Sequence, residues 1–281
     1  MAKWTTVFSL FITIFSFSQE LKKIASLPDF LIETSGLVAI NDTVLATHND
    51  GGGKAEIYFL NLKGEVIHTL KLKDTKNKDW EDIAMNEKGD LFVADIGDNQ
   101  NKRDHVSIYK IPASKVWNKE VFPERLKFDY PEKHGTPKTD SLYFDAEAMI
   151  AVGDSLYIFT KNRTDPFDGK VLIYGINSSV KRQRAKLIHT FELCKGGWQT
   201  CSITAADYYP KTDEVVFITY RHMYRIKNFR KKKINTPEII RLPSLKQREG
   251  VAFSKDGKTV YVSDEKQRIL GGGNLYKKEW K

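Results

Sequence analysis

The residues best suited to chemistry in this sequence are three carboxylates that recur at one position of a short repeated segment. The first copy of the segment spans residues 34–39 and has Ser35 at its second position; the four later copies have Asp82, Glu147, Ala205 and Glu249 there. Carboxylates gathered near one axis repel each other unless a cation, a basic side chain or a retained proton offsets their charge. Oxygen ligands of this kind suit Ca²⁺ or Mg²⁺. We therefore predict a divalent cation, with Ca²⁺ as the candidate, held by Asp82, Glu147 and Glu249. Pairing of each acid with Arg163, Arg221 or Arg248 is the alternative.

Other charged residues are predicted to gather on the face where the inner strands begin and their neighbours end. The candidate ligand-binding residues there are Asp50, Asp95, Lys161, Arg163, Arg221 and Asp264. Trp80 and Trp198 are predicted to border the opening of the central channel on this face. The sequence contains no G-x-S-x-G, H-E-x-x-H or dinucleotide-binding motif, so it gives no support to a serine hydrolase triad or a zinc protease.

The elements that must position these residues follow from what surrounds each copy. In each copy, a turn residue lies seven residues after the second residue of the segment. A run of β-branched and aromatic residues follows the turn. Next comes a strand that contains a tyrosine: Tyr58, Tyr109, Tyr174, Tyr224 or Tyr276. A repeat of roughly 40–65 residues made of short strands is typical of a β-propeller blade. We predict an all-β, five-bladed β-propeller. The alternative has six blades, with residues 111–144 as a degenerate extra blade.

The fifth blade lacks its outermost strand at the C-terminal end of the chain. Residues 21–27 have strand-like composition and no place in the first blade. Pairing them with residues 274–278 would close the ring and remove the open edges that a partial propeller exposes. The sequence therefore predicts closure by an N-terminal strand.

The first 18 residues have the layout of a secretory signal peptide. Lys3 precedes an apolar run over residues 7–17, and small residues follow before Gln19. We expect cleavage after Ser18, a single propeller domain over residues 19–281, a secreted or periplasmic location, and no transmembrane anchor after cleavage. Export argues against nucleic acid as the partner of a chain with a formal charge of +9. A basic exterior instead favours an anionic surface ligand or a small molecule, and we expect a monomer.

The two cysteines, Cys194 and Cys201, enclose a short segment that contains two glycines. Cysteines this close in an exported chain are predicted to form a disulfide that closes one loop. A metal site at this pair has no His or Cys partner nearby in sequence.

Several segments together resemble exported bacterial propellers of the SdiA-regulated type, and also esterase-like phytase and SMP-30/NHL-type propellers. The resemblance is carried by residues 35–37, 80–84, 95–99 and 248–252 as they stand in this sequence. It implies an extracytoplasmic propeller, often with a central cation. Blade four departs from the pattern, because Thr204-Ala205-Ala206 stands where an acid is expected, which puts a full metal site in doubt.

Three functions are compatible with these features. The favoured one is a binding module whose central funnel holds a small ligand, a cation or a surface partner. The second is a metal-assisted hydrolase of a phosphoester or lactone, in which Lys161, Arg163 and Arg221 bind the substrate anion. The third is a glycosidase with paired carboxylates and Trp80 as a sugar platform. The sequence alone leaves open whether the protein is an enzyme.

Overall fold

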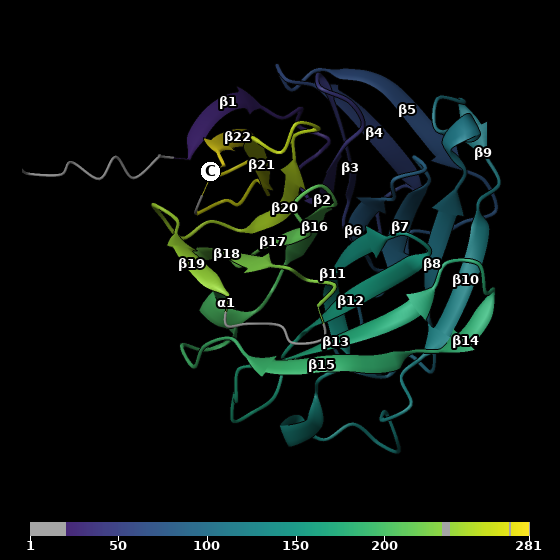
Figure 1. Ribbon diagram of the computed structural model, residues 1–281, viewed down its shortest axis with the longest axis vertical. Coiled ribbons are helices and arrows are strands. Elements are labelled where there is room, and N and C mark those ends of the chain that lie inside the picture. The colour runs from purple at the N-terminus through teal and green to yellow at the C-terminus, as the bar shows by residue number, and fades with distance from the viewer. Residues whose placement is uncertain (1–20, 232–236, 270, 281) are drawn as a thin grey trace, which may run out of the picture.

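The computed structural model describes residues 21–231, 237–269 and 271–280, and they form five antiparallel sheets arranged as the blades of a ring (Figure 1). Blade 1 contains β2 (Thr34–Ala39), β3 (Val44–Asn49), β4 (Glu56–Asn61) and β5 (Val66–Leu72). Blade 2 contains β6 (Trp80–Met85), β7 (Leu91–Asp95), β8 (Val106–Ile111) and β10 (Glu124–Asp129). Blade 3 contains β11 (Asp145–Val152), β12 (Ser155–Lys161), β13 (Lys170–Asn177) and β15 (Lys186–Glu192).

The last two blades complete the ring. Blade 4 contains β16 (Ala205–Tyr209), β17 (Glu214–Ile218), β18 (His222–Lys227) and β19 (Glu238–Arg241). Blade 5 contains β20 (Arg248–Phe253), β21 (Thr259–Asp264), β22 (Asn274–Glu279) and β1 (Lys22–Ser26). The predicted five-bladed propeller is confirmed, with β2, β6, β11, β16 and β20 as the innermost strands.

The N-terminal strand closes the ring as predicted. β1 pairs antiparallel with β22, and Ser26 lies opposite Asn274. The apolar side chains of Leu21, Ala25 and Leu27 are buried at this seam. The first and last strands of the domain therefore hold each other in one sheet.

The core lies between neighbouring blades. All six residues of β2 and all six of β20 are buried, whereas every residue of the outer strand β15 is exposed or half-buried. Five apolar clusters each join two adjacent blades; Phe92 of blade 2 and Met149 of blade 3, for example, belong to the same one. The inner strands are therefore covered on both faces, so even their polar residues are buried.

Gly36 shows why the repeated segment needs a glycine in its first copy. It has a φ of +66°, and a Cβ at this position would lie 2.7 Å from the Ile83 nitrogen of blade 2. Only glycine allows both this left-handed backbone and so close an approach of two innermost strands.

The long connection in blade 2 does not form a sixth blade. It contains β9 (Glu120–Val121), which adds in parallel to β5 of blade 1, before the chain enters β10. A second short strand, β14 (Arg182–Arg184), leaves blade 3 and adds in parallel to β10. The connections therefore join the outer edges of successive blades.

The remaining short helices lie outside the sheets: two 3₁₀ turns at Ala113–Lys115 and Thr139–Ser141, and α1 (Trp198–Cys201). None of the helices within the described residues has the length and hydropathy needed to cross a membrane. The predicted signal peptide, residues 1–18, lies outside the described residues.

Candidate functional site

A β-bulge recurs at one place in three innermost strands and turns a glutamate toward the central mouth. The strand register skips one residue in β6, β11 and β20, and that residue is Glu81, Glu147 and Glu249, respectively. Glu81, and not Asp82, is therefore the equivalent of Glu147 and Glu249. The predicted alignment of blade 2 is wrong by one residue, and a shift of one residue along a strand moves a side chain to the opposite face.

The three glutamates line a cavity of about 550 Å³ at the mouth of the central channel. Polar and charged side chains dominate its wall, and Trp198 and Tyr220 add two aromatic surfaces. Seven carboxylates form a connected cluster at this mouth: Asp50, Asp79, Glu81, Asp145, Glu147, Glu249 and Glu265. Only three basic side chains line the described part of the cavity: Lys161, Arg163 and Lys246.

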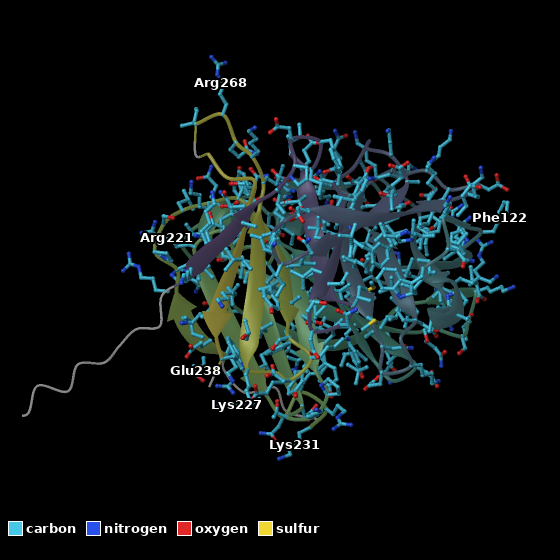
Figure 2. The ribbon with its side chains drawn as sticks, turned by 90° about the horizontal axis from the view of Figure 1, so that it is seen from above. Phe122, Arg221, Lys227, Lys231, Glu238 and Arg268 are labelled. Carbon is cyan, nitrogen blue, oxygen red and sulfur yellow. A yellow bond between two sulfur atoms is a disulfide. The ribbon has the colours of Figure 1, made fainter. Side chains whose placement is uncertain are left out.

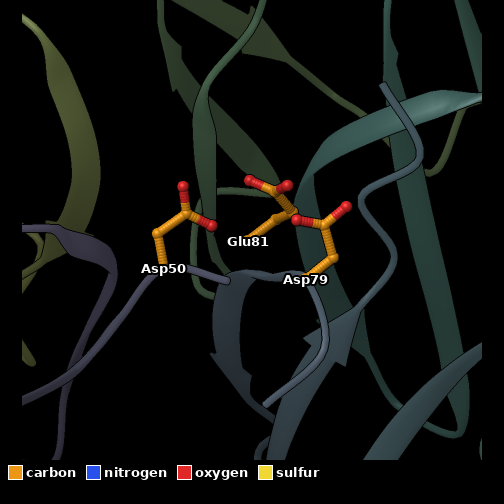
Figure 3. A group of neighbouring side chains, drawn as sticks. All are labelled: Asp50, Asp79 and Glu81. Carbon is orange, nitrogen blue, oxygen red and sulfur yellow. The ribbon is translucent and has the colours of Figure 1, made fainter. Parts of the chain in front are cut away.

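Glu81 is the carboxylate without compensation. It is 4% exposed, and among the described residues no hydrogen bond donor or basic group contacts its side-chain oxygens. Figure 3 shows the carboxylates of Asp50, Asp79 and Glu81 facing one common space, where their oxygens lie within 4.8 Å of one another. Burial, followed by repulsion from Glu147, raises the pKa of Glu81 well above its usual range.

Glu147, in contrast, sits in a compact ion-pair network. Lys161 Nζ donates to both of its carboxylate oxygens, and Arg163 approaches one of them at 3.2 Å. Arg163 also binds Asp145, with Nε 2.7 Å from Oδ2. Burial still raises the pKa of Glu147 to about 8, with Asp145 and Glu249 acting in the same direction. Lys161 and Arg163 are thus both paired with carboxylates of blade 3.

Glu249 is held by neutral donors. Tyr220 donates its hydroxyl to Glu249 Oε1 at 2.9 Å, and Gln247 Nε2 lies 3.1 Å from the same oxygen. Glu265 lies against Glu249, and burial together with this like charge raises the pKa of Glu265 to about 10. Neutral donors and a like-charged neighbour therefore surround Glu249.

Asp50 and Asp79 complete the side of the mouth that has no ion pair in the described structure. Burial raises the pKa of Asp50 to about 7, with Glu249 adding to the shift. Burial likewise raises the pKa of Asp79 to about 6, with Asp145 adding to it. The backbone of Gly97 closes this side, and a Cβ there would clash with Glu81 and Asp79.

The structure brings five of the predicted site residues to the cavity and places four elsewhere. Asp50, Glu147, Lys161, Arg163 and Glu249 line it. Asp82 instead accepts the backbone N–H groups of Ile83, Met149 and Ala206, which come from blades 2, 3 and 4. Its carboxylate ties three innermost strands together within the ring.

The other three residues away from the cavity have local partners or face outward. Asp95 pairs with Arg103 at 2.8 Å, and Asp264 accepts the hydroxyl of Tyr276 at 2.8 Å. Arg221 lies in the turn before β18 and is not among the lining residues; Figure 2 shows its side chain at the rim of the molecule. Trp80 is also away from the mouth, because it is fully buried in the core between blades 1 and 2.

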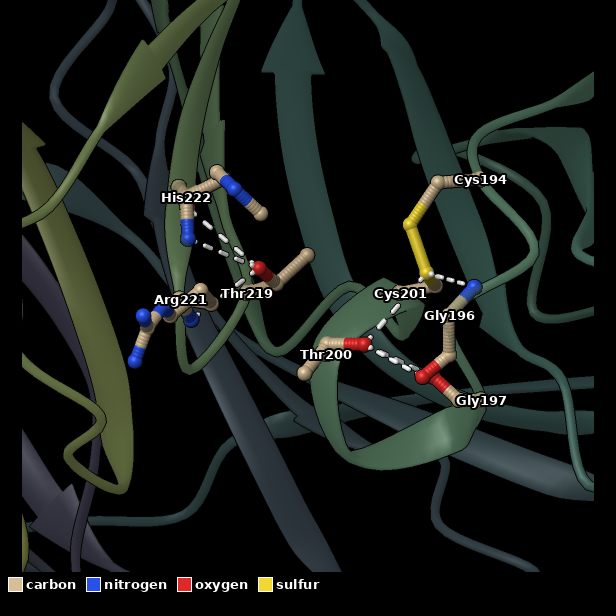
Figure 4. The surroundings of a disulfide bond; sticks show 8 residues. All are labelled: Cys194, Gly196, Gly197, Thr200, Cys201, Thr219, Arg221 and His222. Carbon is tan, nitrogen blue, oxygen red and sulfur yellow. Dashed lines mark hydrogen bonds between the residues drawn. A yellow bond between two sulfur atoms is a disulfide. The ribbon is translucent and has the colours of Figure 1, made fainter.

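Trp198 borders the mouth as predicted, on the loop that the disulfide closes. Cys194 and Cys201 are bonded, with 5.4 Å between their Cα atoms, and Gly196 donates its N–H to Cys201 Sγ (Figure 4). Trp198 begins α1 inside this loop and is 44% exposed. The Arg163 guanidinium lies 5.6 Å from its ring, so the tryptophan and the blade 3 ion pairs form one wall.

This arrangement is suited to binding positive charge. The donor set is almost entirely oxygen, the acids outnumber the bases, and several carboxyl groups have pKa values near or above neutrality. The sequence-based site set omitted several lining or neighbouring residues, among them Asp79, Glu81, Asp145, Tyr220 and Glu265. The β-bulge that directs Glu81 toward the mouth depends on the strand register, which the sequence does not give. In the sequence, Glu81 is only a second acid beside Asp82.

No family model and no curated protein sequence matches the chain. Its fold is similar to solved structures at low identity. The structure of U3-55K is 10% identical, with a TM-score of 0.50, and the match covers 93% of this chain and all of that one. A gluconolactonase from Xanthomonas campestris is 10% identical, with a TM-score of 0.46, over 84% of this chain and 68% of that one. The WD40 repeats of RRP9 match at 10% identity and a TM-score of 0.44. The five sheets arranged in a ring make this chain a β-propeller.

Proposed function

We propose that the protein is an exported binding module whose central mouth binds a hard divalent cation such as Ca²⁺. The observation that carries this proposal is Glu81, a buried carboxylate that faces other carboxylates and has no compensating partner among the described residues. An uncompensated buried charge is costly, so a cation at this point would remove a large unfavourable term.

The residues at the mouth fit such an ion. Two groups of three oxygens contain Glu81: one with Asp50 and Asp79, the other with Asp145 and Glu147. Ca²⁺ takes six to eight oxygen ligands in flexible geometry, and carboxylates are among its usual ones. Lys161 and Arg163 already pair with Asp145 and Glu147 of the second group, so the first group is the favoured position for the ion.

An extracytoplasmic location supports calcium as the ion. A disulfide persists in oxidising compartments, and this chain has one at the edge of the site. The predicted signal peptide is consistent with the same compartment.

Calorimetric titration of calcium into EDTA-treated mature protein tests the proposal. We expect saturable heat with one site per chain and an increase in melting temperature, because an ion bound only by the native state stabilises it by mass action. Glu81→Gln should abolish both effects, and Asp42→Asn, which removes an exposed carboxylate from the turn between β2 and β3 at the end of the innermost strand opposite the mouth, should leave them unchanged. Absence of heat and of any thermal shift in the wild type would contradict the proposal.

A metal-assisted hydrolase of a phosphoester or lactone is the second candidate. Glu147 favours it, because a carboxyl with a pKa of about 8 beside the Lys161 ammonium is suited to general acid–base catalysis near neutral pH. Hydrolysis of nitrophenyl phosphate and of a simple lactone by the calcium-loaded protein tests it. Activity that Glu147→Gln removes while calcium binding persists would support the enzyme; inactivity toward both would leave the binding module.

A further inference from the structure

The outer edge of blade 2 carries a basic face that the central mouth does not use. β14 pairs in parallel with β10 so that Lys127 lies opposite Arg182 and Asp129 lies opposite Arg184. Partners in a parallel ladder point to the same side, and side chains alternate along each strand. Arg125 therefore shares this face, whereas Leu126 and Phe128 point into the core.

The pairing of Lys127 with Arg182 places two like charges directly against each other. Such a pair is destabilising unless an anion offsets it. Within the described structure, no carboxylate lies within salt-bridge distance of either side chain, although Arg184 pairs with Asp129 at 3.1 Å. Burial and the nearby Lys127, Arg125 and Arg182 lower the pKa of His105, which reports the positive field at this face.

The basic face is hollowed into a groove. A cavity of about 300 Å³ is lined by His105, Lys127 and Arg182, and it shares Asp104, Asp129 and Arg184 with a neighbouring cavity of about 480 Å³. A third cavity, of about 440 Å³, is lined by Arg125, which shares the face of Lys127 on β10, and by Phe122 at the rim of the molecule (Figure 2). The three together hold eight lysines and arginines against three acids: Lys102, Lys115, Arg125, Lys127, Lys133, Lys181, Arg182 and Arg184 against Asp104, Glu124 and Asp129.

We propose that this groove on blade 2 binds an acidic polysaccharide. The elongated shape fits a chain of sugar rings, and arginine and lysine pair strongly with carboxylate or sulfate groups spaced along it. Phe128 and Tyr130 are buried, and Phe122 is an exposed aromatic ring at one end, so the groove lacks the succession of stacking surfaces that the bases of a single-stranded nucleic acid use. The site is independent of the acidic mouth, which would repel the same ligand.

Binding of the full mature chain to polygalacturonate and dextran sulfate tests this proposal, with neutral dextran and single-stranded oligothymidine as comparison ligands. We expect both acidic polysaccharides to bind with an affinity that falls steeply as salt rises. The double variant Lys127→Gln/Arg182→Gln should weaken binding by about tenfold or more and should reduce the salt dependence. It removes a repulsive pair, so its melting temperature should not fall.

The matched control is Lys63→Gln/Lys76→Gln, which removes the same charge from exposed positions of blade 1 and its following loop. This control should bind as the wild type does, and so should Glu81→Gln. Equal weakening in both double variants would mean that net charge alone drives binding and would overturn the proposal. Preference for oligothymidine over the polysaccharides, or no binding to either polysaccharide at low salt, would also overturn it.

Discussion

At the scale of single residues, the mouth divides into acids that have partners and acids that do not. Glu147 is bound by Lys161 and Arg163, and Glu249 is bound by Tyr220 and Gln247. Glu81 occupies the equivalent position in blade 2 with no such donor among the described residues. Equivalent positions in a repeat therefore differ in charge compensation because their neighbours differ.

Two amide substitutions should consequently have opposite effects on stability in the absence of divalent cations. Glu81→Gln should raise the melting temperature at pH 8, because it removes a buried carboxyl that is surrounded by like charges. Glu147→Gln should lower the free energy of unfolding by about 1–3 kcal/mol, because it leaves the buried Lys161 ammonium without its ionic partner. Thermal scans of both variants in EDTA check the signs. Destabilisation by both substitutions would show that Glu81 has a partner.

The raised pKa values give a pH dependence with a definite sign. Asp50 and Asp79 have folded-state pKa values of about 7 and 6, above their values in the unfolded chain. Their contribution to stability is present below the unfolded pKa and is lost as pH rises through the folded one. The metal-free protein should therefore lose melting temperature between about pH 4 and pH 8.

Saturating calcium should flatten that decline, because the ion stabilises the ionised carboxylates. Asp50→Asn should remove part of the decline below pH 7, and Asp42→Asn should leave it as in the wild type. Thermal scans at several pH values, with calcium and with EDTA, provide the comparison. A metal-free protein whose stability rises over this pH range would contradict the pKa directions.

At the scale of elements, the blades depend on strands that come from distant parts of the chain. β1 completes blade 5, and β9 and β14 extend the sheets of blades 1 and 2. These additions cover outer edges and connect neighbouring blades, which limits exposed strand edges where the protein could pair with another chain.

Deletion of residues 19–27 should destabilise the domain sharply. It removes the antiparallel pairing with β22 and the burial of Leu21, Ala25 and Leu27. Each large buried apolar side chain is worth about 1.5–3 kcal/mol. The melting temperature should therefore fall by roughly 10 °C or more. A truncated protein that melts with the mature chain would show that the ring does not depend on this closure.

At the scale of the whole molecule, charge is separated. The chain has a formal charge of +9, yet its central mouth concentrates acids, and basic residues gather on the outer edge of blade 2. The sign of the net charge of the whole chain therefore does not predict the sign of the ligand at each surface. The two faces are expected to attract ligands of opposite sign.

The sequence was sufficient for the architecture and only partly for the site. Repeated strands and turns predicted five blades, an unassigned strand predicted the closure, and the spacing of Cys194 and Cys201 predicted the disulfide. The blade 2 alignment assumed a constant spacing from the acid to the turn. Blade 2 has five residues between Met85 and Leu91, whereas blade 3 has two between Val152 and Ser155, so constant spacing selected Asp82 in place of Glu81. Neighbouring acids cannot be distinguished without the strand register, because each would fit the pattern on one face or the other.

An anomalous scattering map from crystals of the mature protein grown with calcium tests the central claim most directly. We predict one peak in the mouth, about 2.3–2.6 Å from a carboxylate oxygen of Glu81 and from oxygens of Asp50 and Asp79. Crystals of Glu81→Gln grown in the same way should lack that peak. A mouth without a peak in the wild type, or a calcium ion bound only at another place, would contradict a cation site at Glu81.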